Sequence, residues 1–363
     1  YSRALRKAVR KGSVVVDIGT GTGIMALLAC RYGARRVYAI EPDSAIEVAR
    51  AAARNNGCAD RIVFLQDLST RIELPEPADV VVSDLRGILP LFQRNLPAIA
   101  DARRRFLKPG GALIPLRDTL WAAVVETPRL YRTLTAPWTA NSFHLDLGAA
   151  LRVVTNSICK VQARPSELLT APLTVATLDY TTIEESSVRA PIEAVAQRAG
   201  TAHGLAVWFD SVLAPGIEFS NAPGAAKMVY GQMFFPFPEP VEVAAGDRFT
   251  VTLQADLVGE DYVWRWETSV HDGGSTGPPR ARFEQSTFWS VPLSLADLEK
   301  REAGYVPTLN AQGEIESFIL SQMDGKTTQE EIARRAQARF PAEFHRWEDA
   351  LTRAGEIARK FSR

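Results

Sequence analysis

One ten-residue stretch constrains the fold of this chain more than any other. It runs from Val14 to Gly23 and consists of three valines, Asp-Ile and the glycine-rich series Gly-Thr-Gly-Thr-Gly. Three consecutive valines predict a buried strand, and the glycines predict a tight turn that opens a helix. Glycine is needed where the backbone turns sharply and lies close to a ligand. The stretch therefore predicts a cofactor turn, and the alternative is a strand-to-helix turn that binds nothing.

Short apolar runs alternate with helical patterns over the first 125 residues. The runs cover residues 14–16, 36–40, 62–65, 80–82 and 112–114, and the helical patterns cover residues 24–32, 44–56 and 89–107. Ser44 is the expected N-cap of the second helix, and the Lys-Pro-Gly-Gly series at 108–111 is expected to end the third. Strand alternating with helix predicts an α/β, doubly wound, Rossmann-like domain over residues 1–125.

The pattern of apolar, Pro and Gly residues changes twice after residue 125. Short alternating stretches between Pro and Gly residues predict an antiparallel β-barrel domain over residues 126–297, with a less regular arm at about 129–157. Residues 305–363 predict a small winged-helix module, with an edge strand at 305–309 and helices at 314–322, 329–339 and 342–361. Thr327 and Glu330 form the expected capping box of the middle helix.

Three acids at the ends of predicted strands indicate which cofactor the turn binds. Gly19, Thr20 and Gly21 belong to a G-x-G-x-G series, and Ile24 stands where the last glycine of a dinucleotide fingerprint would be. Asp17 suits the ammonium group of an amino acid, Glu41 the ribose hydroxyls, and Asp67 the adenine amino group. These three acids together with the turn predict a class I S-adenosylmethionine site.

Composition excludes several other classes of function. Lys and Arg number 42 and Asp and Glu number 42, so the formal net charge is zero, which argues against a nucleic-acid partner. Three distant cysteines and four scattered histidines give neither a disulfide framework nor a metal site. The chain has no apolar run long enough to span a membrane and no signal peptide, so we expect a cytoplasmic protein.

The residues of the first two regions resemble the protein arginine methyltransferase family. The likeness is carried by residues 33–41 (Gly-Ala-Arg-Arg-Val-Tyr-Ala-Ile-Glu), 106–111, 203–210 and 220–223, and it extends over about residues 1–290. Residues 1–5 are similar to the end of that family's cofactor-covering helix, whose earlier part would precede Tyr1. The resemblance implies a head-to-tail homodimer that forms through the arm.

The substrate loop departs from this family's pattern. The family holds a guanidinium between two glutamates, but here Asp84 and Gln93 take those positions, and the loop gains Arg86. Tyr230 lies in a Met-Val-Tyr series that replaces the family's Thr-His-Trp motif. Asp84 and Gln93 are therefore the expected catalytic residues, and Arg86 and Tyr230 the expected substrate-binding residues. One carboxylate and an amide suit a neutral carboxamide better than a cation.

The last region resembles the PqqD-like domains of ribosomal peptide natural-product pathways. Residues 309–315 (Leu-Asn-Ala-Gln-Gly-Glu-Ile), 323–328 and 331–333 carry this likeness. It implies that the edge strand at 305–309 captures the leader of a precursor peptide by β-augmentation. The alternative is a module that only braces the barrel.

These observations give one leading hypothesis and two alternatives. The leading hypothesis is methyl transfer from S-adenosylmethionine to a side-chain nitrogen of a precursor peptide. The expected acceptor is the Asn carboxamide, as in the asparagine N-methyltransferases of proteusin-type pathways that the chain resembles. The alternatives are an arginine N-methyltransferase, with Asp84 acting alone, and a non-catalytic peptide-binding scaffold.

Overall fold

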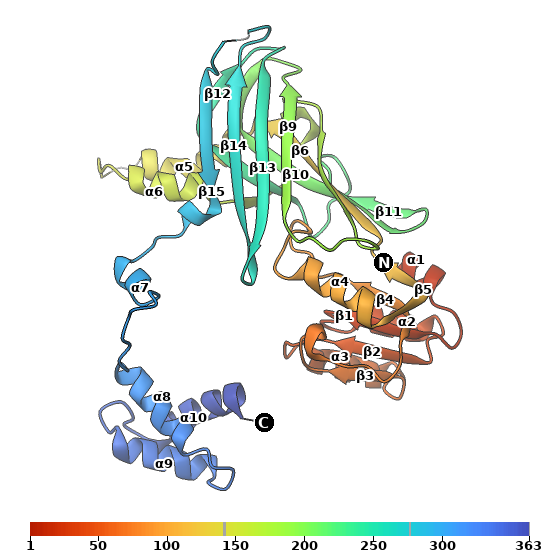
Figure 1. Ribbon diagram of the computed structural model, residues 1–363, viewed down its shortest axis with the longest axis vertical. Helices are drawn as coiled ribbons and strands as arrows, with labels where there is room; N and C mark the ends of the chain where they lie inside the picture. The colour runs from red at the N-terminus through yellow and green to blue at the C-terminus, as the bar shows by residue number, and fades with distance from the viewer. Residues whose placement is uncertain (141–142, 276, 363) are drawn as a thin grey trace. The chain divides into compact units, whose positions relative to one another are not determined.

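The computed structural model describes residues 1–140, 143–275 and 277–362. The chain divides into two compact units, Tyr1–Pro292 and Leu293–Arg363, and Figure 1 shows the elements of each. The first unit contains a parallel sheet and two antiparallel sheets, and the second consists of helices.

The amino-terminal sheet is parallel, with strand order β3-β2-β1-β4-β5. Its strands are β1 (Val14–Ile18), β2 (Arg36–Ile40), β3 (Ile62–Leu65), β4 (Ala78–Ser83) and β5 (Leu107–Ile114). The flanking helices are α1 (Ser2–Ala8), α2 (Ile24–Arg31), α3 (Ile46–Asn55) and α4 (Asn95–Arg105), with a 3₁₀ turn η1 (Ser69–Arg71). Alternate residues of β1 enter cores on opposite faces, Val15 with α1 and α2, and Val14 and Val16 with α4. The doubly wound sheet predicted from the sequence is confirmed.

Three local expectations in this region were wrong. The helix expected from residue 89 begins at Asn95, because Pro90 disfavours a helix and residues 84–94 form a loop whose Leu89 and Leu91 are buried. Ser44 does not cap α3, whose N-cap position is Ala45. The Lys-Pro-Gly-Gly series lies inside β5 and does not end a helix.

The antiparallel part begins at Arg117, earlier than the expected boundary near residue 126. One sheet runs β7 (Cys159–Val161), β12 (Gln232–Val243), β10 (Gly200–Ala214), β6 (Arg117–Val125), β8 (Leu173–Asp179), and β11 (Ile217–Ser220) also pairs with β10. The other runs β15 (Ala281–Ser286), β14 (Asp261–His271), β13 (Arg248–Val258), β9 (Val188–Val195). Short 3₁₀ turns lie at η2 (Pro165–Glu167) and η3 (Thr287–Ser290).

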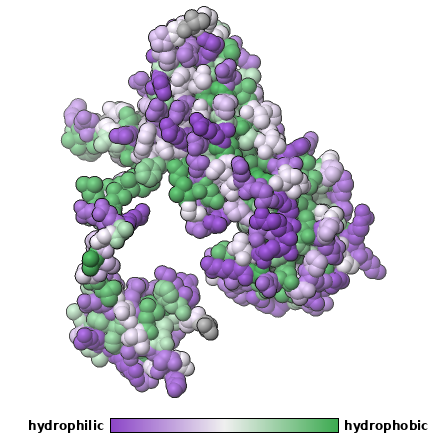
Figure 2. Space-filling model, viewed as in Figure 1, coloured by the Kyte–Doolittle hydropathy of each residue, from purple (hydrophilic) through white to green (hydrophobic). Residues whose placement is uncertain are grey.

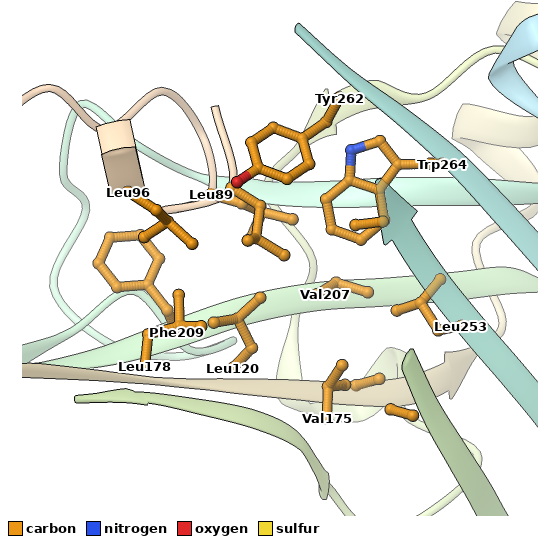
Figure 3. Packing of buried hydrophobic residues seen from close by; sticks show 14 of the residues in the cluster. Leu89, Leu96, Leu120, Val175, Leu178, Val207, Phe209, Leu253, Tyr262 and Trp264 are labelled. Carbon is orange, nitrogen blue, oxygen red and sulfur yellow. The ribbon is translucent and has the colours of Figure 1, made fainter. Parts of the chain in front are cut away.

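The parallel and antiparallel parts share one hydrophobic core. Leu89 and Leu96, from the loop after β4 and from α4, lie in the same cluster as Leu120 and Phe209 of the antiparallel sheet (Figure 3). Trp264 of β14 extends this cluster, and its ring centroid is 5.2 Å from that of Phe235. Continuous packing therefore fixes the loop after β4 against the antiparallel sheet.

The arm expected at about 129–157 contains two helices, α5 (Pro128–Thr139) and α6 (Gly148–Thr155). Tyr131 of α5 is buried, and its hydroxyl donates to the carbonyl oxygens of Phe237 and Pro238 of β12. Phe143, between the two helices, is 78% exposed. The base of the arm is thus anchored to the sheet, while its tip presents an apolar side chain.

The second unit contains α7 (Leu295–Glu299), α8 (Ala311–Ser321), α9 (Gln329–Arg339) and α10 (Trp347–Phe361). Ile315, Ile319, Ile332 and Ile357 form the centre of its core. The edge strand expected at 305–309 is wrong, because these residues have no regular structure and Val306 is 82% exposed. Within residues 293–362 the structure describes helices and irregular segments only, so the expected winged-helix class is not confirmed.

Part of the connection between the units exposes apolar side chains, shown in green in Figure 2. Its exposed apolar side chains are Phe288, Trp289, Val291, Leu293, Leu295 and Leu298. Among the described helices, none combines the length and the hydropathy needed to cross a membrane.

The cap of α9 gives a test of how the second unit is stabilised. The expected cap was Thr327, but the side chain of Thr328 accepts from the backbone N–H of Glu331. We expect Thr328→Ala to lower the free energy of unfolding of the second unit by about 1 kcal/mol, because the N–H loses its acceptor. Urea unfolding followed by circular dichroism measures this change. Thr352→Ala, at an exposed position of α10, should leave stability unchanged or slightly raised. Equal losses in both variants would contradict the cap.

Candidate functional site

The glycine turn after β1 is held tightly against its neighbours. The backbone N–H groups of Gly19 and Thr20 both donate to the carbonyl oxygen of Ile40, at 2.9 and 3.0 Å. Gly19, Gly21 and Gly23 have φ values of 71°, 52° and 86°, which disfavour other residues. A Cβ on Gly19 would lie 2.4 Å from the Leu85 side chain, so the turn also contacts the loop after β4.

Asp17 lies beneath this turn and is 1% exposed. Its carboxylate accepts a hydrogen bond of 2.5 Å from the hydroxyl of Thr20. Burial raises the pKa of Asp17 to about 6, although the Thr20 hydrogen bond opposes this change. Asp17 and Thr20 support the turn from behind, and they are not among the residues that line the cavity in front of it.

A cavity of about 560 Å³ opens at the carboxyl ends of β1, β2 and β3. Gly19, Glu41 and Asp67 line it, as the sequence predicted, together with Leu85 and Gln93. The Glu41 carboxylate accepts from the backbone N–H of Gly21 at 2.9 Å, which holds one of its oxygens beside the turn. These lining residues fit S-adenosylmethionine, because two carboxylates face a cavity of nucleoside size. The glycines would let a bound cofactor approach the backbone closely.

Gln93 and Asp84 do not form the pair that the sequence predicted. Gln93 is exposed, has a φ of 42° and lines the cofactor cavity, and no hydrogen bond between described residues joins it to Asp84. Asp84 faces the antiparallel part, where one carboxylate oxygen accepts from the hydroxyl of Tyr230, just before β12, at 2.6 Å. Burial of Tyr230 raises the pKa of its phenol. The structure thus brings Asp84 and Tyr230 together and leaves Gln93 at the cofactor side.

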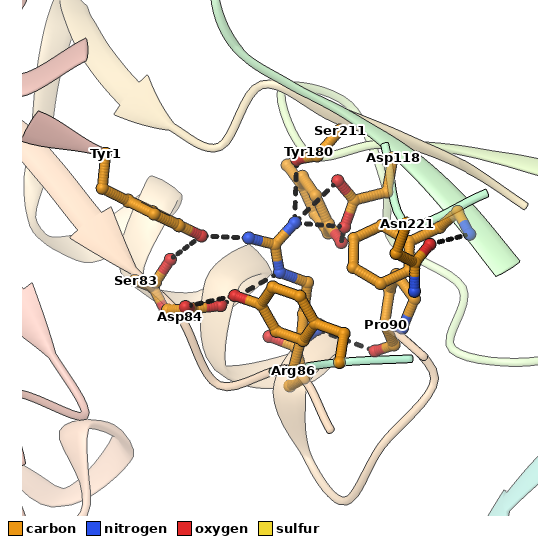
Figure 4. A network of polar contacts seen from close by, with 12 residues as sticks. Tyr1, Ser83, Asp84, Arg86, Pro90, Asp118, Tyr180, Ser211 and Asn221 are labelled. Atoms are coloured by element: carbon orange, nitrogen blue, oxygen red, sulfur yellow. Dashed lines mark hydrogen bonds and ion pairs between the residues drawn. The ribbon is translucent and has the colours of Figure 1, made fainter. Parts of the chain in front are cut away.

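Arg86 is buried inside the protein, with a side chain that is 1% exposed. Its guanidinium donates to Asp84 at 3.1 Å and to both carboxylate oxygens of Asp118 at 2.9 and 3.0 Å (Figure 4). It also donates to the hydroxyls of Ser211 and Tyr1. Arg86 was expected to contact a substrate. Its guanidinium instead makes its hydrogen bonds to residues of the chain itself.

Sequence reasoning missed the partners of Arg86. Asp118 is fully buried and also accepts from the Tyr180 hydroxyl at 2.6 Å. The one available signal was an acid at the start of an otherwise apolar stretch, since residues 120–125 read Leu-Trp-Ala-Ala-Val-Val. Ser211 comes from the distant strand β10, and no local pattern connects it to the loop. Within the described residues, no group of three or more His, Cys, Asp or Glu side chains is arranged to hold a metal ion.

Comparisons with known proteins agree with this arrangement. The family described as ribosomal protein L11 methyltransferase (PrmA) matches residues 3–115, and the arginine methyltransferase oligomerization subdomain matches residues 117–262. A rice protein named probable histone-arginine methyltransferase CARM1 is 34% identical over 259 residues, which are 67% of this chain and 49% of that protein. Both matched parts of the chain are thus similar to PRMT-like class I methyltransferases. The chain spans about half the length of this and similar plant relatives.

Other relatives of this PRMT-like chain are covered more fully. The arginine N(omega)-methyltransferase of Streptomyces achromogenes subsp. streptozoticus is 29% identical over 257 residues, 69% of this chain and 70% of that protein. The solved Trypanosoma brucei PRMT1 enzyme-prozyme complex with AdoHcy has a TM-score of 0.69 at 20% identity, covering 78% of this chain and 94% of that one. The solved structure of Arabidopsis thaliana protein arginine methyltransferase 10 has a TM-score of 0.67 at 22% identity, covering 78% of this chain and 93% of that one. At these identities, the two structures establish the shared fold.

The two family matches together end at residue 262, within the PRMT-like unit. The PqqD-like resemblance of the second unit therefore stays a prediction.

The raised pKa of Asp17 predicts how stability changes with pH in this PRMT-like protein. The folded-state pKa of about 6 exceeds the ordinary value of 3.8, so folding favours the protonated acid. The resulting stability is present at low pH and is lost as pH rises through 6. Relative to wild type, Asp17→Asn should therefore gain up to roughly 3 kcal/mol in free energy of unfolding between pH 4 and 7. Urea titrations across this range measure the difference.

Asp79 provides the opposite control. Burial opposes its ionisation, but hydrogen bonds from Lys108 and Val14 hold its pKa below the ordinary value. Asp79→Asn should therefore lose stability relative to wild type as the pH rises toward the ordinary value of 3.8, and it should show no gain between pH 4 and 7. The same pH trend in both variants would contradict the assignment for Asp17.

The buried pair between Arg86 and Asp118 predicts a large loss on mutation. Asp118→Asn should lower the free energy of unfolding by about 3–5 kcal/mol, because Arg86 stays buried with a weakened partner. Asp272→Asn is the control, since Asp272 is 63% exposed in its ion pair with Arg280 and should contribute less than about 1 kcal/mol. Denaturant unfolding compares the two, and equal losses would contradict the role given to burial.

Proposed function

We propose that this protein is an S-adenosylmethionine-dependent N-methyltransferase that modifies a side-chain nitrogen of a protein or peptide. The observation that carries the proposal is the continuity between the cofactor cavity and the loop after β4. Leu85 lines the cavity with Gly19, and the neighbouring Asp84 faces the antiparallel sheet. A methyl donor in the cavity and an acceptor beside Asp84 would thus lie on opposite sides of Leu85.

The residues of the cavity give each part of the cofactor a partner. Glu41 would accept from the ribose hydroxyls and Asp67 from the adenine amino group. Asp17, ionised above about pH 6, would favour the ammonium of the methionine end from beneath the turn, with Thr20 fixing its orientation. Bound there, S-adenosylmethionine supplies the methyl group, and Asp84 orients the acceptor nitrogen and accepts a proton from it.

The acceptor has two candidates. Relatives are named as arginine methyltransferases, which supports a guanidinium, with Asp84 as its carboxylate partner. The carboxamide of Asn is the second candidate. It is supported by Arg86, which pairs with Asp84. Either nitrogen needs a hydrogen-bond acceptor that fixes its direction, and Asp84 retains a side chain that is 24% exposed.

The partners belong to the same proposal. The oligomerization subdomain match covers the arm, and the exposed Phe143 at the tip of the arm is suited to burial against a second copy in a homodimer. A precursor peptide would be the substrate if residues 305–363 bind its leader. Without an edge strand at 305–309, that contact would have to use the helices of the second unit.

Two peptides that differ at one residue test the function. The full-length protein is incubated with S-adenosylmethionine and a glycine-rich peptide with either Arg or Asn at its centre, followed by mass spectrometry. We expect a methyl mass increase on one of them. Glu41→Gln should weaken cofactor binding by about tenfold to a hundredfold, since a charge-assisted hydrogen bond contributes about 1.5–3 kcal/mol.

Glu76→Gln is the matched control, because Glu76 pairs with Arg35 just before β4, at the opposite edge of the sheet. It should leave cofactor affinity unchanged in calorimetry. Absence of cofactor binding by the wild-type protein would contradict the proposal and favour the non-catalytic scaffold.

A further inference from the structure

The guanidinium of Arg86 lies in a cage of aromatic rings and carboxylates. Its central carbon is 5.2 to 5.6 Å from the ring centroids of four aromatic residues, Tyr1, Phe209, Phe219 and Tyr230. The carboxylates of Asp84 and Asp118 complete the cage. Aromatic faces and carboxylates are the groups that bind a guanidinium most strongly.

The hydrogen bonds of this cage match the fork of the guanidinium. The Nε group donates to Asp84, one terminal nitrogen donates to Asp118 and Ser211, and the other donates to the Tyr1 hydroxyl. A lysine would supply one point charge in place of this fork. The cage is therefore built for a guanidinium, and the chain's own Arg86 fills it.

The cage adjoins the place where the methyl donor is proposed to bind. Asp84, Leu85 and Arg86 follow β4 directly, and Leu85 contacts Gly19 and lines the cofactor cavity. Asp84 is 24% exposed, whereas Arg86 and Asp118 are at most 1% exposed. The only member of these three that an acceptor can reach is a carboxylate already paired with a guanidinium.

We propose that Arg86 determines substrate specificity by acting as a resident guanidinium. It occupies the cage, excludes an arginine side chain from it, and weakens the attraction of Asp84 for a second cation. The acceptor that this site takes is then an uncharged nitrogen such as a carboxamide, whose N–H can donate to Asp84 without a charge clash. This inference rests on the proposed methyltransferase function, and its first test below is independent of methylation.

The first experiment asks whether the emptied cage binds a guanidinium. Full-length Arg86→Ala is heated with millimolar guanidinium chloride or methylguanidine, with ammonium chloride as the salt control. We expect a saturable rise in melting temperature for this variant and none for the wild type. Arg280→Ala is the matched control, because Arg280 also pairs with two acids but is 39% exposed, and it should show no saturable rise. Absence of binding to a folded Arg86→Ala would overturn the proposal.

The second experiment compares the two peptides. The wild type should methylate the Asn peptide and not the Arg peptide, whereas Arg86→Ala should gain at least tenfold in activity on the Arg peptide. Arg86→Lys keeps the charge and should gain nothing. Efficient methylation of the Arg peptide by the wild type would overturn the inference, and this result does not require any variant to fold.

The two proposals fail in different ways. Guanidinium binding by Arg86→Ala, with neither peptide methylated by any form, would support the filled cage and contradict the methyltransferase function. Methylation of the Arg peptide by the wild type would support the function and contradict the role of Arg86.

Discussion

The buried ion pair between Arg86 and Asp118 joins the two halves of the first unit. Arg86 belongs to the loop after β4 of the parallel sheet, while Asp118 and Ser211 belong to β6 and β10 of the antiparallel sheet. Two charges withdrawn from water are tolerated only when the remaining donors and acceptors are satisfied, and here Tyr1, Tyr180 and Asp84 satisfy them. These contacts hold the loop in place, with Asp84 between the cofactor cavity and the antiparallel part.

The glycine turn and this loop constrain each other. Gly19 leaves room for Leu85, and a side chain at position 19 would displace it together with Asp84 and Arg86. The glycine turn is itself held by its hydrogen bonds to Ile40 and by the buried pair of Asp17 and Thr20. A change in the glycine turn would therefore also change the loop after β4, so the proposed positions of donor and acceptor depend on each other.

Local patterns were enough to bring the residues of the predicted cofactor site to one cavity. The valine strand, the glycine turn and the acids at 41 and 67 lie together because carboxyl ends of parallel strands meet at one edge. The acceptor half could not be predicted in this way. Arg86 meets residues 32 and 125 positions away along the chain, and its burial depends on how two sheets pack. The tail shows the same limit, because an apolar run at 305–309 resembles a strand but has no partner strand among the described residues.

The balance of charge in the cage bears on what the site can do. Asp84 and Asp118 carry two negative charges and Arg86 one positive charge, while burial keeps the phenols of Tyr1, Tyr180 and Tyr230 protonated. The cluster thus retains one negative charge, and only Asp84 presents it to the outside. Arg86 reduces the field that a cation would experience there but leaves Asp84 able to accept a hydrogen bond. Such a site binds an N–H donor through the geometry of a hydrogen bond more than through charge attraction. This suits an amide nitrogen, which carries no charge.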